Sequence, residues 1–197
     1  MRYDMHVHIN IHGDEGEMEK YEYFAKMNRL DVVGFVIHYN PKMSRKELRD
    51  YKDFVYSLEI NALSGLELYY PVEKIPSGFD FYILHFSNIT VDADILSSFR
   101  DIIIAHPLSY GMRLANSAIP IIKRNNIGIE CNSAHYTSKL QKFYYDLKRE
   151  DITIPFGSDA HTPEEIGAGF EELQRIFSPF EKVKRDLILK KISFYKN

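Results

Sequence analysis

Short apolar runs alternate with longer amphipathic stretches from one end of the chain to the other. The runs at 32–38 and 101–106 are apolar on both faces, which is typical of strands buried in a parallel sheet. The pattern predicts strands at 3–9, 32–38, 62–69, 79–86, 101–106, 127–132 and 153–157. It predicts helices at 16–29, 44–58, 92–99, 114–125, 136–149 and 163–177, with a closing helix at about 180–192.

Local signals mark the start of two predicted helices. Ser44 and Glu47 are spaced as a capping box, and Thr162 is followed by Pro163 and two acidic residues. No linker, low-complexity segment or close repeat interrupts the alternation, so we expect a single domain over residues 1–197. Seven β/α units in one domain predict an α/β fold, and the pattern alone leaves a doubly wound sheet and a barrel both open.

The composition is that of an ordinary globular protein, with 45% hydrophobic and 27% charged residues. The net charge of -3 gives no general attraction to nucleic acid or to an anionic membrane, so neither is favoured as a partner. The single cysteine, Cys131, cannot form an internal disulfide, which favours a reducing compartment. No apolar run approaches the roughly 20 residues of a membrane span, and the first residues lack the apolar region of a signal peptide. We therefore expect a cytoplasmic protein.

Residues of metal-ligating type recur at the ends of the predicted strands. His6 and His8 are two positions apart in the first strand, so their side chains point to the same face. The other candidate ligands are Asp14, His38, Glu67, His85, His106, Asp159 and His161. Any one of them alone is more often a structural residue than a ligand. Their recurrence at one end of successive strands, where α/β barrels place their active sites, favours a common metal site.

The chemistry of this set narrows the function. Imidazole and carboxylate ligands suit Zn, Mn or Fe(II), and the absence of a cysteine cluster argues against a structural zinc site. Nine ligands exceed the needs of one ion, so we expect two or three ions with a bridging carboxylate. Ions about 3.5–4 Å apart can activate hydroxide and stabilise the attacking and leaving oxygens of a phosphoryl transfer, which favours a hydrolase.

At this point the sequence resembles the PHP (polymerase and histidinol phosphatase) family of metal-dependent phosphoesterases, from residue 4 to about residue 173. The similarity rests on DMHVH at 4–8, GLE at 65–67, AHP at 105–107 and GSDAHT at 157–162. Where the family usually has Thr-Asp-His, this chain has VIH at 36–38, so the histidine is kept and the acid is lost. The resemblance implies a distorted (β/α)7 TIM-like barrel with a trinuclear site.

The resemblance also implies which ligands share an ion. One ion would lie among His6, His8, Glu67 and Asp159. Glu67 would bridge to a second ion held by His85 and His106, and the third would take Asp14, His38 and His161. His12 is the alternative to Asp14, because histidine is common at that point in relatives.

Other residues near the same rim have less defined roles. Arg113 and Lys42 are candidates for binding the substrate phosphate, with a salt bridge at a helix start as the alternative for each. Glu130 and Asn132 are candidates to orient a ligand histidine, whereas His135 is expected at the surface or behind the ligands. Tyrosines that could line a substrate pocket are Tyr69, Tyr70, Tyr110 and Tyr136.

These features favour a metal-dependent phosphoesterase that acts on a small phosphomonoester. A nuclease acting on nucleic-acid ends is an alternative, as is a non-enzymatic RNA-binding barrel of the ribonuclease P type. The full ligand set and the net charge of -3 count against the RNA-binding barrel. Hydrolysis of a C–N bond by an amidohydrolase-type barrel is less favoured, because no strand-end lysine is available to bridge the metals. The substrate, the metal and the oligomeric state stay open.

Overall fold

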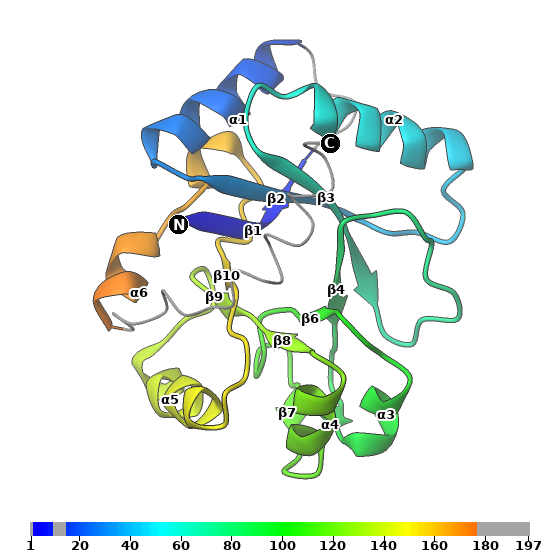
Figure 1. The fold of residues 1–197 in the computed structure, drawn as a ribbon, viewed down its shortest axis with the longest axis vertical. Coiled ribbons are helices and arrows are strands. Elements are labelled where there is room, and N and C mark those ends of the chain that lie inside the picture. Colours follow the sequence, from blue (N-terminus) through cyan, green and yellow to red (C-terminus); the bar gives the residue numbers. More distant parts are fainter. Residues whose placement is uncertain (1, 10–14, 177–197) are drawn as a thin grey trace.

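A computed structural model describes residues 2–9 and 15–176, in which strands and helices alternate (Figure 1). The long strands are β1 (Tyr3–His8), β2 (Val32–His38), β3 (Ala62–Tyr69) and β4 (Phe81–His85). Two-residue strands follow: β5 (Thr90–Val91), β6 (Ile103–Ile104), β7 (Arg113–Leu114), β8 (Gly128–Ile129), β9 (Cys131–Asn132) and β10 (Phe156–Gly157). The helices are α1 (Glu15–Met27), α2 (Arg45–Ser57), α3 (Ala93–Ser97), α4 (Ala118–Arg124), α5 (Gln141–Arg149) and α6 (Phe170–Ile176), with 3₁₀ turns η1 (Ser138–Leu140) and η2 (Pro163–Glu165).

Six strands form one curled parallel sheet in the order β1-β2-β3-β4-β6-β8 (Figure 1). Because neighbouring strands are parallel, their carboxyl ends lie along one edge of the sheet. The register places His38 beside Glu67, and Tyr69 beside His85. Residues that are far apart in the sequence are thereby brought next to each other where the strands end.

The expected α/β fold is confirmed, but the expected distorted (β/α)7 TIM-like barrel is confirmed only in part, because the six-stranded sheet does not close. β9 and β10 form a separate two-stranded sheet instead of continuing the six-stranded one. The chain after β10 meets β1 through an isolated bridge between Val7 and Ala160, where the His8 amide donates to the Ala160 carbonyl at 2.7 Å. The sheet curls through β1 to β8, and short irregular pairings cover the remaining side.

Several elements are shorter than the sequence pattern predicts. The predicted strand at 127–132 is divided by Glu130 into β8 and β9, and the one at 153–157 contributes only β10. The predicted helix at 163–177 is interrupted between η2 and α6, where Gly167 and Gly169 have φ of +70° and +74°. The helices at 92–99 and 114–125 shorten to α3 and α4, and the helix at 136–149 begins as η1. The predicted helix at 180–192 lies outside the described residues, as do His12 and Asp14.

Helices pack on the outer face of the curled sheet, with α1 and α2 beside β1, β2 and β3 (Figure 1). Tyr51 on α2 is fully buried, and its hydroxyl donates to the Phe35 carbonyl at 2.7 Å and accepts from the Gly65 amide at 3.1 Å. The aromatic ring therefore fills the core while its polar end satisfies the two strands beneath it. No helix within the described ranges is long and apolar enough to cross a membrane.

Candidate metal centre

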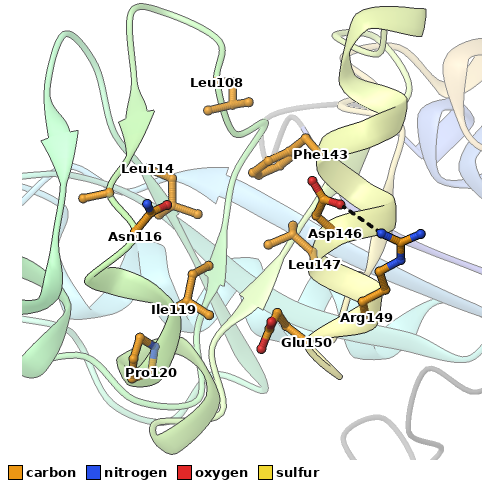
Figure 2. A pocket seen from close by; sticks show the side chains of 11 residues that line it. Leu108, Leu114, Asn116, Ile119, Pro120, Phe143, Asp146, Leu147, Arg149 and Glu150 are labelled. Carbon is orange, nitrogen blue, oxygen red and sulfur yellow. Dashed lines mark ion pairs between the residues drawn. The ribbon is translucent and has the colours of Figure 1, made fainter.

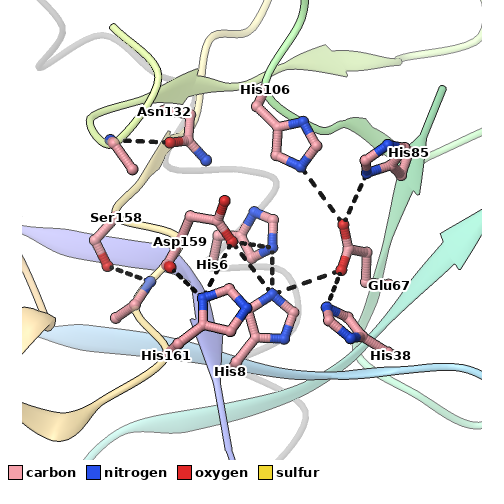
Figure 3. Close-up of polar contacts among 12 residues, drawn as sticks. His6, His8, His38, Glu67, His85, His106, Asn132, Ser158, Asp159 and His161 are labelled. Atoms are coloured by element: carbon pink, nitrogen blue, oxygen red, sulfur yellow. Dashed lines mark hydrogen bonds and ion pairs between the residues drawn. The ribbon is translucent and has the colours of Figure 1, made fainter. Parts of the chain in front are cut away.

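All predicted ligands that fall within the described ranges converge on one site (Figure 3). They come from β1, β2, β3 and β4 and from the loops after β6 and β10. They are His6, His8, His38, Glu67, His85, His106, Asp159 and His161. Asp14, predicted as a ligand of the third ion, lies outside the described residues.

Backbone geometry directs these side chains toward one another. His6 and His8 alternate with buried apolar residues on β1, so both imidazoles face the same side. Asp159 has a left-handed backbone with φ of 58°, a conformation that aspartate tolerates better than most residues. The sharp turn after β10 therefore places its carboxylate against His6 and His8 at a conformational cost of about 1–3 kcal/mol.

The donor atoms fall into three overlapping groups, in each of which they lie within 4.8 Å of one another. The first group is His8, His38 and His161, the second is His6, His8 and Glu67, and the third is Glu67, His85 and His106. His8 and Glu67 each belong to two groups, so the three groups form a continuous chain. Glu67 has two carboxylate oxygens and could therefore serve two neighbouring ions, whereas a single imidazole nitrogen of His8 has one lone pair and could bind only one.

Glu67 is at the centre of the chain and is 1% exposed. One carboxylate oxygen, Oε2, lies 2.9 Å from His38 Nε2 and 3.5 Å from His8 Nε2. The other oxygen, Oε1, lies 3.5 Å from His85 Nδ1 and 3.6 Å from His106 Nε2. Because its two oxygens face different pairs of histidines, Glu67 is placed as a bridging carboxylate would be.

Asp159 occupies the corresponding position on the other side of His6 and His8 (Figure 3). Its Oδ1 lies 3.4 Å from His6 Nε2 and 3.3 Å from His8 Nε2, and these two nitrogens are 3.1 Å apart. Its other oxygen lies 3.3 Å from Nε2 of His135. The His161 ring is held by the contact of its Nδ1 with the Asp159 carbonyl at 2.8 Å.

The electrostatic environment keeps both carboxylates charged. Burial alone would raise the pKa of Glu67, but its close contacts with the His106, His38 and His85 imidazoles outweigh burial and hold the pKa far below its usual range. Burial likewise opposes a low pKa for Asp159, and the neighbouring histidines again hold the pKa well below its usual range. Both groups are therefore available as anionic ligands at neutral pH.

The residues present fit a set of divalent metal ions. Two donors bound tetrahedrally to an ion at about 2.0–2.2 Å lie roughly 3.4 Å apart, which is close to the Asp159 and Glu67 distances given above. Nδ1 of His85 is buried without a hydrogen-bond partner and is directed at Glu67, as a nitrogen reserved for a metal would be. Nitrogen and carboxylate donors without a thiolate suit Zn, Mn or Fe(II).

Glu130 supports this site from behind, a role that the sequence left open. It is 1% exposed, and its Oε1 lies 2.8 Å from His6 Nδ1. Its Oε2 accepts hydrogen bonds from the His106 amide at 2.6 Å and from the Asn132 side chain at 3.1 Å. Burial of His6 opposes protonation, but the Glu130 carboxylate outweighs it and raises the pKa of His6 to about 9. Glu130 thus orients His6 so that Nε2 faces the other ligands.

Asp4 is a second supporting carboxylate, to which the sequence assigned no role beyond its place in DMHVH. It is fully buried and accepts hydrogen bonds from three backbone amides. The distances are 3.2 Å from His6, 2.9 Å from Ser158 and 2.9 Å from Gly167. Asp4 therefore ties β1 to the chain on both sides of the Asp159 turn.

His135, expected at the surface or behind the ligands, is partly exposed and lies beside a candidate ligand. Its contact with Asp159 brings it to the edge of the ligand cluster, and its ring centroid lies 5.0 Å from that of His106. Two of the predicted pocket tyrosines also border the cluster. Tyr69 and Tyr110 lie with their ring centroids 4.7 Å and 5.1 Å from that of His85.

The two predicted phosphate-binding residues lie apart from these contacts. Arg113 is exposed in β7, which pairs with β5 outside the six-stranded sheet. Lys42 is exposed in the loop after β2, and its amide donates to the Asn40 side chain at 2.9 Å. Within residues 2–9 and 15–176, neither forms an ion pair with Glu67 or Asp159.

A separate groove of about 760 Å³ lies between α4 and α5 (Figure 2). Its walls carry Leu114, Ile119, Phe143 and Leu147, with the ion pair between Asp146 and Arg149 on one side. None of the candidate metal ligands lines it. The groove is therefore distinct from the metal centre.

Comparison with known proteins identifies similar folds. No protein-family model matches the chain, and no curated protein matches it in sequence. A chain in the cryo-EM structure of archaeal ribonuclease P with mature tRNA is similar with a TM-score of 0.65 at 12% identity, over 98% of this chain and 90% of that one. A second similar chain comes from the crystal structures of YwqE from Bacillus subtilis and CpsB from Streptococcus pneumoniae, which are described as unique metal-dependent tyrosine phosphatases. It has a TM-score of 0.65 at 14% identity, and the match covers 96% of this chain and 92% of that one.

Proposed function

We propose that this protein is a metal-dependent phosphoesterase of the PHP type that hydrolyses a small phosphomonoester. The observation that carries the proposal is the chain of three overlapping ligand groups joined by His8 and Glu67. A fold shared with a chain from proteins described as metal-dependent tyrosine phosphatases supports it. The reaction adds water across a P–O bond and yields an alcohol and inorganic phosphate.

Divalent ions held in this site would activate water, offset the charge of the phosphate and stabilise the leaving oxygen. The chain's own residues prepare the site for that chemistry. Glu67 and Asp159 supply negative charge at buried positions, and Glu130 fixes the orientation of His6. His38 and His161 are half exposed, so they form the side of the cluster that a substrate can approach from solvent.

The sequence leaves two alternatives to this proposal: one acts on a different substrate, and the other involves no catalysis. A nuclease would use the same cluster on nucleic-acid ends. A non-enzymatic RNA-binding role is the other alternative, because a chain of the archaeal ribonuclease P structure has the same fold similarity. That role needs no converging imidazoles, and the buried Nδ1 of His85 would then have no partner to offset the cost of its burial.

The test is phosphate release from a panel of phosphomonoesters by protein loaded with Zn or Mn. We expect hydrolysis that chelation abolishes and a divalent ion restores, because the imidazoles and carboxylates cannot activate water as well on their own. The panel should include a single-stranded oligonucleotide to detect nuclease activity. Hydrolysis that persists in chelator, with metal confirmed absent, would rule out the proposed mechanism, and tight RNA binding without hydrolysis would favour the scaffold role.

A further inference from the structure

Two tyrosine rings stand at the edge of the metal centre with much of their surface in solvent. Tyr69, at the end of β3, is 43% exposed, and Tyr110, in the loop after β6, is 53% exposed. Both rings contact the same ligand histidine, His85, at centroid distances of 4.7 Å and 5.1 Å. Large apolar groups exposed beside a polar site often mark a binding surface.

The hydroxyl groups of these tyrosines are turned toward the site. The Tyr69 hydroxyl lies 3.5 Å from Glu67 Oε2, and the Tyr110 hydroxyl lies 3.4 Å from His135 Nε2. The Tyr110 ring also lies 5.3 Å from the His135 ring, which is itself partly exposed. Because the polar ends are occupied by these contacts, the exposed surface of the two tyrosines is mainly ring.

Charged side chains at this rim offer little basis for distinguishing one phosphomonoester from another. Across the described ranges, no lysine or arginine pairs with Glu67 or Asp159, and Arg113 lies in β7. The phosphate of a substrate would be recognised mainly by the metal ions, and this recognition is the same for every phosphomonoester. Selection among phosphomonoesters then depends on the part of the substrate beyond the phosphate.

We propose that Tyr69, Tyr110 and His135 form a subsite that selects substrates whose leaving group carries a planar aromatic ring. This inference rests on the phosphoesterase function proposed above. The ring of the leaving alcohol stacks on the aromatic side chains while its phosphate reaches the ligand cluster, because aromatic pairs prefer stacked or edge-to-face contacts at 4.5–7 Å between centroids. An aliphatic ring of the same size has no such contact.

Two substrates separate ring stacking from leaving-group reactivity. 2-Phenylethyl phosphate and 2-cyclohexylethyl phosphate both release a primary alcohol and have similar size, but only the first has a planar ring. We expect kcat/KM to be about three- to tenfold higher for the phenyl ester, mainly through a lower KM. The ratio of the two values within one protein is the quantity to compare, since it cancels differences in metal loading.

Variants then locate the effect. Tyr69→Leu and Tyr110→Leu keep apolar bulk but remove the ring, so each should bring the ratio toward one. Tyr110→Phe should retain the preference, because it keeps the ring. Tyr23→Leu removes an equally exposed tyrosine from α1, away from the centre, and should leave the ratio unchanged.

Binding of two non-hydrolysable phosphonates, 3-phenylpropylphosphonate and its cyclohexyl counterpart, provides a readout that does not depend on turnover. Calorimetry should show the same preference for the phenyl compound in the metal-loaded protein. A ratio near one in the parent, or a preference that survives both leucine substitutions, would overturn the subsite. If neither ester nor any phosphomonoester of the panel above is hydrolysed, the phosphoesterase proposal fails, and the phosphonate affinities still decide whether the ring subsite exists.

Discussion

Glu130 is a buried carboxylate outside the candidate ligand set that holds two members of that set in place. Its carboxylate spans His6 Nδ1 and the His106 amide, which belong to different ligand groups. Gly157 leaves just enough room for it, since a Cβ at that position would lie 2.0 Å from Glu130 Oε1. Two ligand positions therefore depend on this one buried side chain.

Glu130→Gln keeps the size of the side chain but removes its charge and half of its acceptor capacity. We expect the affinity for Zn or Mn to fall about 10- to 100-fold, as is typical when the partner of a ligand histidine is changed. Competition with a chelator of known affinity measures the change. Glu150→Gln, at an exposed position after α5, is the control and should bind metal like the parent; equal affinity in Glu130→Gln would contradict the positioning role.

At the residue scale, the sequence could predict the ligands because they stand in recognisable positions. His6 and His8 share a strand face, and GSDAHT places Asp159 and His161 after the last strand. His135 lies three residues beyond the predicted strand at 127–132 and belongs to no motif, and its place beside Asp159 depends on how the loop after β9 folds back. That kind of proximity is a tertiary property, which no local spacing encodes.

At the element scale, Asp4 holds β1 to the segment that carries Asp159 and His161. Asp4→Ala would leave the buried amides of His6, Ser158 and Gly167 without their acceptor. We expect the free energy of unfolding, measured in urea, to fall by about 3–5 kcal/mol, since each unsatisfied buried donor costs about 1–3 kcal/mol and water recovers part of this.

Asp50→Ala is the matched control for this substitution. Asp50 pairs with Lys46 one turn away on the exposed side of α2, and a surface pair of this kind is worth about 0.3–0.5 kcal/mol. If Asp4→Ala destabilised the protein no more than Asp50→Ala does, Asp4 would not be the link between β1 and the closing segment.

The elements themselves were predictable where the pattern is strong. Strands β1 to β4 and helices α1 and α2 match their predicted ranges closely, because buried apolar runs and the Ser44 capping box define them. The later strands shrink because polar buried residues such as Glu130 and a proline at 155 interrupt the regular ladder. Their hydrophobic pattern is that of a strand, and backbone amides such as those of Ile129 and Cys131 still donate to the neighbouring segment, at Thr153 and Pro155.

At the scale of the whole molecule, the family resemblance implied a distorted (β/α)7 barrel, and the structure has a curled six-stranded sheet whose open side is closed by short, loosely paired segments. The loosely paired side contributes Asp159 and His161, and Glu130 lies where the six-stranded sheet ends, between β8 and β9. The strand pairing is therefore least regular where turns, and not straight strands, position the residues of the candidate centre. Pattern reasoning recognises alternation, and it cannot show where a ladder gives way to such turns.

The central claim is that several metal ions bind together in this cluster. Elemental analysis of purified protein, loaded with Zn or Mn and freed of excess metal by gel filtration, tests it directly. We predict two or three ions per chain, falling by at least one ion in Glu67→Ala, because that carboxylate is shared by two ligand groups. A parent protein that retains one ion or none, or a Glu67→Ala variant that retains the full number, would contradict the claim.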